Sequence, residues 1–552
     1  MTSLERMRGT RPAAFAVGRR HLPFLVALAA GIAIRFVVLV AYRPALLFPD
    51  SFNYLRHASA MRLSPVHPAG YPLFLWPFVN LLGSVHAIAA FQHLLGLGIA
   101  VAGYALVVRR GLPRWAATLA MLPVLFDPLQ LALEQFVLSD LPFEVLLVAA
   151  CVVLLWRPGR PGVATLVVTG LLIAAATLTR GAGQLVLAAF VVAALWLRVS
   201  WPKLVTLVLA AVIPLAGYAV AYNHVHGQYS LETAGPRFLY ARLAPIVVCR
   251  EVSLPSYEQP LCPQEPLQDR ASIDWYMWHG HHAAQYHVQP PAGMTQVQMV
   301  RDFDQRVLRA EPRRYAHTVA VQLLKGFSWS RHAHIKGRPA GRWLFHKGYW
   351  LLPMLVAHHR VEPGTTAGTR VDRSAAAFLT GYRHRIWTPG PLLLLLLVVS
   401  LAAVLGVGRS RRSGDRVAVG LLVAACMVPL LTAVALNGFS WRYQLPQIPL
   451  LPMAGALAAA ALVRGSAPGR RPGPLPRIRL VLVLLAAVGV GCVTGLAAVL
   501  TGWASTTTAS LAGSAAAAAV AVLLLVSRAW SAWDVVLPGP PPTSGTGTPE
   551  HR

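Results

Sequence analysis

Ionisable residues recur beside the ends of the apolar segments of this chain, where they could act on a substrate. They are Asp50, Asp127, Glu134, Asp140, Arg180 and Arg442. Ionised side chains at membrane depth are costly, so those present tend to line a cavity and contact a substrate. Taken alone, Asp50 could equally be a helix cap, and either arginine could anchor a helix end at lipid headgroups. Two carboxylates and two arginines from separate segments, all at one membrane face, favour a common site.

The composition is that of a polytopic membrane protein. Of the 552 residues, 56% are hydrophobic and 12% are charged, and the mean hydropathy is +0.54. Many apolar runs approach the ~20 residues that a spanning helix needs, and about 12 transmembrane helices are expected. The predicted spans are 21–42, 86–108, 113–129, 131–156, 163–179, 184–199, 204–222, 389–408, 417–436, 446–463, 478–500 and 509–527.

Basic residues mark one side of the membrane as cytoplasmic. With a cytoplasmic amino terminus, the basic clusters that fall on the same side lie at 109–114, 157–160, 198–203, 409–416 and 464–479. The loops 127–140 and 501–508 on the other side contain no Lys or Arg. We therefore expect a multi-pass plasma-membrane protein with both termini inside and a first run that acts as a signal anchor. The net charge of +29 reflects this pattern and contact with membrane lipids, and no nucleic acid is expected as a partner.

The chain divides into membrane and exoplasmic parts. The expected parts are a basic cytoplasmic terminus at 1–20, a membrane core at 21–222 with a first exoplasmic loop at 43–85, an exoplasmic mixed domain at 223–388 between spans 7 and 8, transmembrane helices at 389–528, and a disordered cytoplasmic tail at 529–552. The first loop should hold an amphipathic helix at 51–63 and an interfacial stretch at 67–76. In 223–388, a helix is predicted over 295–329, with an interruption at the Glu311-Pro312 step.

The 223–388 segment contains two cysteines and two histidine runs that could serve as structural or metal-binding groups. A disulfide between Cys249 and Cys262 is permitted in an oxidising compartment. The histidine runs at 279–282 and 332–334 invite a metal, but clustered histidines in an exposed loop lack fixed ligand geometry. No metal site and no cofactor are predicted.

Five short motifs together resemble the GT-C superfamily of polyprenyl-phosphate-sugar-dependent glycosyltransferases. The similarity is to the branch that contains protein O-mannosyltransferases, the lipid A aminoarabinose transferase and the Rgt-type transferases. It extends loosely over residues 21–463. The motifs are Pro49-Asp50-Ser51-Phe52-Asn53-Tyr54 with His67-Pro68-Ala69-Gly70-Tyr71-Pro72, Val137-Leu138-Ser139-Asp140-Leu141-Pro142-Phe143, Ala176-Thr177-Leu178-Thr179-Arg180-Gly181, and Trp441-Arg442-Tyr443-Gln444-Leu445-Pro446.

The resemblance implies a GT-C-like helical membrane fold and transfer of a sugar from a polyprenyl-phosphate donor, with inversion, on the exoplasmic side. Such a displacement needs a carboxylate to take the proton of the acceptor hydroxyl and cations for the departing phosphate. Asp50 is then the expected general base, Arg442 and Arg180 bind the lipid phosphate, and Asp140 orients donor or acceptor. Tyr54, His67 and Tyr71 are further candidates for contact with the sugar or the polyprenyl chain, although each could simply pack against a neighbouring helix.

Two other classes of protein remain open at this point. A transporter or flippase for a lipid-linked sugar would also have about a dozen helices, but it often shows two related halves and polar residues near the midplane. A non-catalytic scaffold or receptor gives no reason for the charged residues at the outer edge. The predominance of Arg among the basic residues hints at a GC-rich bacterial genome, whereas the sugar, the carrier and the acceptor (glycan, lipid or protein) are not specified.

Overall fold

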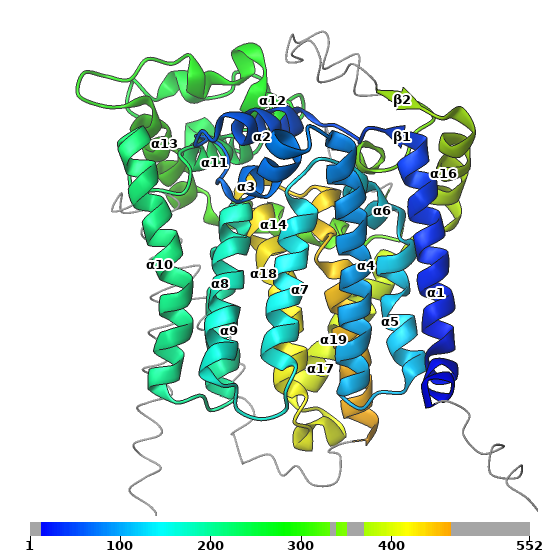
Figure 1. Cartoon of the computed structure of the whole chain (residues 1–552). Coiled ribbons are helices and arrows are strands. Elements are labelled where there is room, and N and C mark those ends of the chain that lie inside the picture. The colour runs from blue at the N-terminus through cyan, green and yellow to red at the C-terminus, as the bar shows by residue number, and fades with distance from the viewer. Residues whose placement is uncertain (1–12, 330, 332–337, 350–368, 465–552) are drawn as a thin grey trace, which may run out of the picture.

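The computed structural model describes residues 13–329, 331, 338–349 and 369–464. Within them, the protein is a bundle of roughly parallel and antiparallel helices, with shorter helices gathered over one end (Figure 1). The helices of the bundle are α1 (Ala13–Ala41), α4 (Val85–Arg109), α5 (Arg114–Phe126), α7 (Asp140–Leu155), α8 (Val163–Thr179), α9 (Val186–Trp196), α10 (Trp201–His226), α17 (Gly390–Leu405), α18 (Arg416–Asn437) and α19 (Gln447–Arg464).

The protein is a multi-pass membrane protein. In the described part of the chain, five helices are long and apolar enough to cross a bilayer, or up to seven if two bent helix pairs each form one span. The remaining predicted spans up to residue 463 fall on shorter apolar helices, such as α8 and α9. The predicted spans 478–500 and 509–527 lie outside the described residues. The predicted total of about 12 therefore stays a prediction.

The basic connections between helices meet at one end of the bundle. Arg110 forms an ion pair of 3.1 Å with Asp415, and Arg109 donates to the carbonyl of Trp156 at 2.7 Å. These contacts join three connections that are far apart in the sequence, at the lower end of the view in Figure 1. This gathering is what the alternation of basic and non-basic loops predicts for a chain that crosses a membrane repeatedly.

The opposite end is covered by short helices. They are α2 (Pro49–Ala60), α3 (Gly70–Trp76), the π-helical turn η2 (Pro77–Leu81), α6 (Pro128–Gln135), α11 (Gly235–Leu243), α12 (Ile273–Trp278), α13 (Gln296–Ala310), α14 (Pro312–Lys325) and α16 (Arg373–Arg385). Strands β1 (Tyr42–Arg43) and β2 (Arg370–Val371) pair antiparallel beside α1. The predicted helix at 51–63 is α2, and the predicted break near residue 311 separates α13 from α14.

Helix α2 is fixed by its first turn. Pro49 stands at its first position, where a missing N–H costs no hydrogen bond. The backbone N–H of Phe48 donates to Ser51 Oγ at 2.9 Å and closes the turn. Phe52 and Tyr54 are buried, and the helix ends at Met61, whose φ of 48° is left-handed. This geometry places Asp50 in the first turn, facing the interior of the end region.

One predicted span was wrong. The run 131–156 forms two helices, α6 and α7, and residues between them are not helical. The reason is a backbone exchange with the first loop: Leu46 N donates to Gln135 O at 2.9 Å, and Val137 N donates to Leu46 O at 3.0 Å. Pro142 then sits in the first turn of α7, where proline is tolerated. Asp140 consequently begins a helix at the end of the bundle.

The segment 223–388 packs as more than one unit. Residues of α11, α12 and α13 form their own hydrophobic core around Tyr240, Met277 and Phe303. By contrast, Trp343, Phe345 and other residues after α14 belong to the main core of the bundle. The segment therefore contributes both to the core of a small helical subdomain and to the core of the bundle, and its assignment as an exoplasmic domain stays a prediction.

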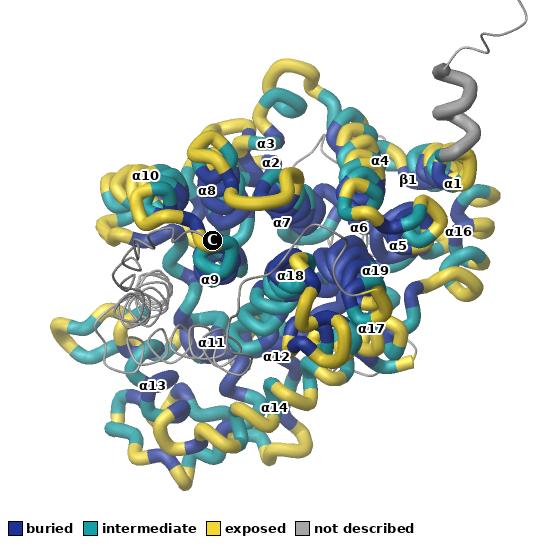
Figure 2. Tube along the Cα trace, turned by 90° about the horizontal axis from the view of Figure 1, so that it is seen from below, coloured by how far each residue is buried: buried dark blue, intermediate teal, exposed yellow. Residues whose placement is uncertain are grey.

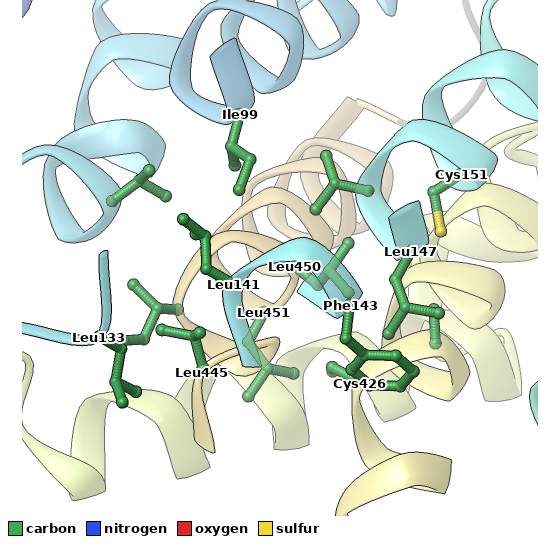
Figure 3. Close-up of a cluster of buried hydrophobic side chains, with 14 of the residues drawn as sticks. Ile99, Leu133, Leu141, Phe143, Leu147, Cys151, Cys426, Leu445, Leu450 and Leu451 are labelled. Atoms are coloured by element: carbon green, nitrogen blue, oxygen red, sulfur yellow. The ribbon is translucent and has the colours of Figure 1, made fainter. Parts of the chain in front are cut away.

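The main core extends through most of the bundle, and Figure 3 shows the part of it between α7, α18 and α19. Phe143 and Leu147 of α7 are buried in it together with Leu450. Cys151 and Cys426 are buried in the same region, as expected for cysteines that only pack. In Figure 2, α7 and α19 are mostly buried, whereas the outer helix α10 is mostly intermediate or exposed.

In the subdomain, Cys249 and Cys262 are joined by a disulfide, with Cα atoms 6.3 Å apart. A loop of this length predicts a stabilisation of about 3 kcal/mol by restriction of the unfolded chain. The Cys249→Ser/Cys262→Ser double variant should therefore unfold at a lower temperature. Alkylation followed by mass spectrometry tests the bond directly: neither cysteine of the native protein should react before reduction, and both should react after it. Labelling of both without a reductant would contradict the bond.

Candidate active site

A cavity of about 380 Å³ opens between the short helices and the upper end of the bundle. Its walls come from α2, the turn after α8, the chain between α10 and α12, and the turn η10 (Trp441–Gln444) that precedes α19. Asp50, Arg180 and Arg442 all line it. Segments separated by nearly 400 residues thus meet at the end of the bundle opposite the basic connections.

The four charged residues predicted as a site lie in one continuous chain. Arg442 donates to Asp50 Oδ2 at 3.1 Å, and its same nitrogen lies 3.9 Å from Asp140 Oδ2. Arg180 donates to the other oxygen of Asp140. The order is Asp50, Arg442, Asp140, Arg180. Asp140 is only 2% exposed and does not line the cavity. It therefore contacts the two arginines from the protein interior, on the side away from the cavity.

Helix ends favour these charges. Asp50 and Asp140 stand in the first turns of α2 and α7, where the positive end of the helix dipole stabilises a carboxylate. Arg180 caps the carboxyl end of α8, where a cation is favoured. The positions of Asp50, Asp140 and Arg180 are therefore favoured by the helix ends as well as by the ion pairs that these residues form.

Aromatic rings hold the two guanidinium groups. The Cζ atom of Arg442 lies 4.9 Å from the ring centre of Trp343 and 5.5 Å from that of Tyr443. Arg180 lies 5.0 Å from the same Tyr443 ring. Such rings attract cations and shield them from water, which strengthens their interaction with an anion. The cavity therefore presents two restrained cations beside one another.

The three further candidates have different positions. Tyr54 lines the cavity, and its hydroxyl pairs with Ser139 Oγ at 3.1 Å. His67 also lines it, 4.8 Å from the Tyr54 ring, and burial lowers the pKa of His67 to about 4, so it is neutral at pH 7. Tyr71 is fully buried behind Tyr54 and donates to Gln92 at 3.0 Å. Tyr71 therefore supports the wall without reaching the cavity.

The sequence did not single out a second charged group that lines the cavity. Arg338 and Arg342 lie 2.6 and 2.9 Å from the carboxylate of Asp274 in α12. Burial raises the pKa of Asp274, but the two arginines prevail and hold it below its usual range. All three residues line the cavity. No sequence signal could have found this group. Asp274 is more than 60 residues before the two arginines, and only the folded chain brings α12 beside them.

Two other acidic residues at the same edge are structural. Glu134 is completely buried and binds Arg35 at 2.7 Å and His93 at 2.7 Å. Asp127 caps α6 through Leu129 N and pairs with Arg331 at 2.9 Å. Neither residue lines the cavity.

The Arg35–Glu134 pair yields a prediction about stability. Arg35→Met should lower the free energy of unfolding by about 3 kcal/mol, because Glu134 would stay buried with one counter-charge fewer. Thermal unfolding in detergent measures the effect, with the exposed Arg62→Met as control. The Arg35→Met/Glu134→Met double variant should be more stable than Arg35→Met. If the double variant is no more stable than Arg35→Met, the buried charge of Glu134 is not the reason that Arg35→Met is destabilised.

Residues 80–201 match the family model described as dolichyl-phosphate-mannose-protein mannosyltransferase. No curated protein matches the sequence. Solved structures that align with the chain include the oligosaccharyltransferase of Archaeoglobus fulgidus in its apo form, at 15% identity over 90% of this chain and 56% of that one, with a TM-score of 0.36. ArnT from Cupriavidus metallidurans bound to undecaprenyl phosphate aligns at 14% identity over 93% of this chain and 79% of that one, with a TM-score of 0.32.

The chain spans 56% of the archaeal enzyme's length. The family match falls on the segment from η2 to the start of α10, which contains Asp140 and Arg180. The expected resemblance is confirmed over this segment: residues 80–201 are similar to the dolichyl-phosphate-mannose-protein mannosyltransferases, which are glycosyltransferases with a polyprenyl-phosphate donor.

Proposed function

We propose that this protein is an integral membrane glycosyltransferase that moves a sugar from a polyprenyl-phosphate carrier to an acceptor hydroxyl on the exoplasmic side. The observation that carries the proposal is the chain of Asp50, Arg442, Asp140 and Arg180 at the edge of the cavity. It pairs an accessible carboxylate with two restrained cations. The basic connections at the other end of the bundle would face the cytoplasm.

The proposed reaction is a single displacement with inversion. The acceptor oxygen attacks the anomeric carbon, its proton passes to a carboxylate oxygen of Asp50, and the bond from that carbon to the phosphate oxygen breaks. The phosphate leaves with the bonding electrons, and Arg442 and Arg180 stabilise its charge. A phosphate is a good leaving group at neutral pH, so no carboxylic acid is needed to protonate it.

The pairing of Asp50 with Arg442 fits this role. The ion pair holds the Asp50 carboxylate at the cavity, where its oxygens can accept a hydrogen bond from an incoming hydroxyl. When a phosphate binds, Arg442 gains a third anionic neighbour beside Asp50 and Asp140, and its hold on Asp50 weakens as its hydrogen bonds are shared. Donor binding would thereby prepare the base. Asp140 keeps both guanidinium groups in place during this exchange, which is a positioning role.

The test is release of the carrier phosphate. Purified protein in lipid vesicles is offered undecaprenyl phosphates that carry different sugars, together with a crude membrane and cell-wall acceptor fraction. Turnover of one donor to undecaprenyl phosphate, dependent on the acceptor fraction, is the expected result. If a lipid-linked sugar crosses the vesicle membrane without release of its phosphate, the protein is a flippase and the proposal is overturned. The family match gives that alternative no support.

A further inference from the structure

Glu232 is a cavity carboxyl that the proposed mechanism does not use. It lies between α10 and α11 and lines the cavity. The backbone on either side is fixed, because Thr233 N donates to Pro65 O at 2.9 Å and Leu231 is fully buried. Its side chain therefore starts from a rigid position on the wall.

Glu232 differs from the other acidic residues at the cavity. Asp50 and Asp274 each bind an arginine at 3.1 Å or less. For Glu232, the structure shows no ion pair and no side-chain hydrogen bond within the described residues. Burial raises its pKa to about 7, with the ionisable groups Tyr218 and Tyr222 nearby. Near neutral pH, a large fraction of this carboxyl is uncharged and can both donate and accept a hydrogen bond.

The position of Glu232 relates it to the proposed phosphate site. A methyl group built on Gly181 would lie 3.7 Å from Glu232 Oε1 and 3.8 Å from the amide nitrogen of Gln184. Gly181 directly follows Arg180, which is expected to hold the lipid phosphate. Glu232 and Gln184 thus face one small space beside that phosphate. In a polyprenyl-phosphate sugar, the group bonded to the phosphate is the sugar ring.

We propose that Glu232 and Gln184 form the subsite for the donor sugar, in which they hydrogen-bond hydroxyl groups of an uncharged ring. This inference rests on the proposed function. A subsite for a cationic amino sugar would need a permanently ionised carboxylate, whereas an uncharged carboxyl and an amide suit hydroxyl groups, which also both donate and accept. The ion pairs of Asp50 with Arg442 and of Asp274 with Arg338 would then be available to bind the phosphate and the acceptor.

Binding measurements on the full-length protein in nanodiscs test the subsite. The probes are undecaprenyl phosphate alone and undecaprenyl phosphates that carry mannose, glucose or an amino sugar. Glu232→Ala should weaken binding of a neutral-sugar donor by about tenfold, the loss of roughly one hydrogen bond. It should leave the Kd for undecaprenyl phosphate unchanged. Glu232→Gln, which keeps a donor and an acceptor, should stay within about threefold of the native protein.

The control is Glu251→Ala, which removes an exposed carboxylate of the same end region. Equal binding of every sugar donor by the native protein and Glu232→Ala would overturn the subsite. The subsite would also be overturned if the native protein bound the amino-sugar donor more tightly than the neutral-sugar donors and Glu232→Gln lost this preference. Such a preference requires a charged carboxylate at position 232. If undecaprenyl phosphate itself fails to bind the native protein, the proposed function is overturned together with the subsite. A failure of the subsite alone is therefore distinguishable from a failure of the proposed function.

Discussion

Asp50→Asn should lower kcat for sugar transfer by about 10³-fold, the usual contribution of a general base. Asparagine keeps the size of the side chain and an oxygen that can still accept from Arg442. It cannot take the proton of the acceptor hydroxyl. The affinity for the donor should change little, because the arginines that would bind the phosphate remain. The measurement is the release of undecaprenyl phosphate at saturating donor.

The matched control is Asp269→Asn, since Asp269 is an exposed aspartate of the same end region and does not line the cavity. Its kcat should equal that of the native protein. Thermal unfolding verifies that the Asp50 variant is folded. A folded Asp50→Asn protein that retains native kcat would show that another group takes the proton. A raised KM with native kcat would instead assign Asp50 to substrate binding.

Arg442→Gln should weaken binding of undecaprenyl phosphate by about 10- to 100-fold, the range for the loss of one charge-assisted hydrogen bond. Arg442 is the residue that lies within reach of both Asp50 and Asp140, and its ring contacts keep it at the cavity edge. Arg442→Lys should be intermediate, because it retains the charge but not the planar fork. Titration of undecaprenyl phosphate into protein in nanodiscs measures each Kd.

The control for Arg442 is Arg409→Gln at the opposite end of the bundle, which should leave the Kd unchanged. The variant also removes a counter-charge from Asp50 and Asp140, so its unfolding temperature needs to be compared with that of the native protein. A stably folded Arg442→Gln protein with native affinity for undecaprenyl phosphate would remove Arg442 from the phosphate site. Arg180 would then be the remaining candidate.

Parts of the site that depend on local sequence could be predicted. Asp50 follows an apolar run and precedes an amphipathic helix, and Arg180 follows another apolar run, so hydropathy alone places both at one membrane face. The position of Tyr71 could not be predicted. Its neighbour Tyr54 faces the cavity whereas Tyr71 lies behind it, and that difference depends on how α2 and α3 pack together.

The interruption between α6 and α7 shows a limit of hydropathy. The run 131–156 is apolar throughout, so composition favours one helix. The backbone of Leu46 competes for hydrogen bonds with residues 135 and 137, and this contact between distant segments breaks the helix. The Ser139-Asp140-Leu141-Pro142 sequence was the available local signal, because proline is favoured in the first turn of a helix.

The sequence by itself determined that the chain crosses a membrane many times, which end of the bundle is basic, and which face bears Asp50 and the arginines. These follow from hydrophobicity and charge, which act residue by residue along the chain. Only the tertiary structure decided that Asp140 lies behind the arginines, that Asp274 faces Arg338, and that Glu232 stands beside Gly181. Such contacts join residues tens to hundreds of positions apart, and they arise from the packing of whole helices rather than from any local pattern.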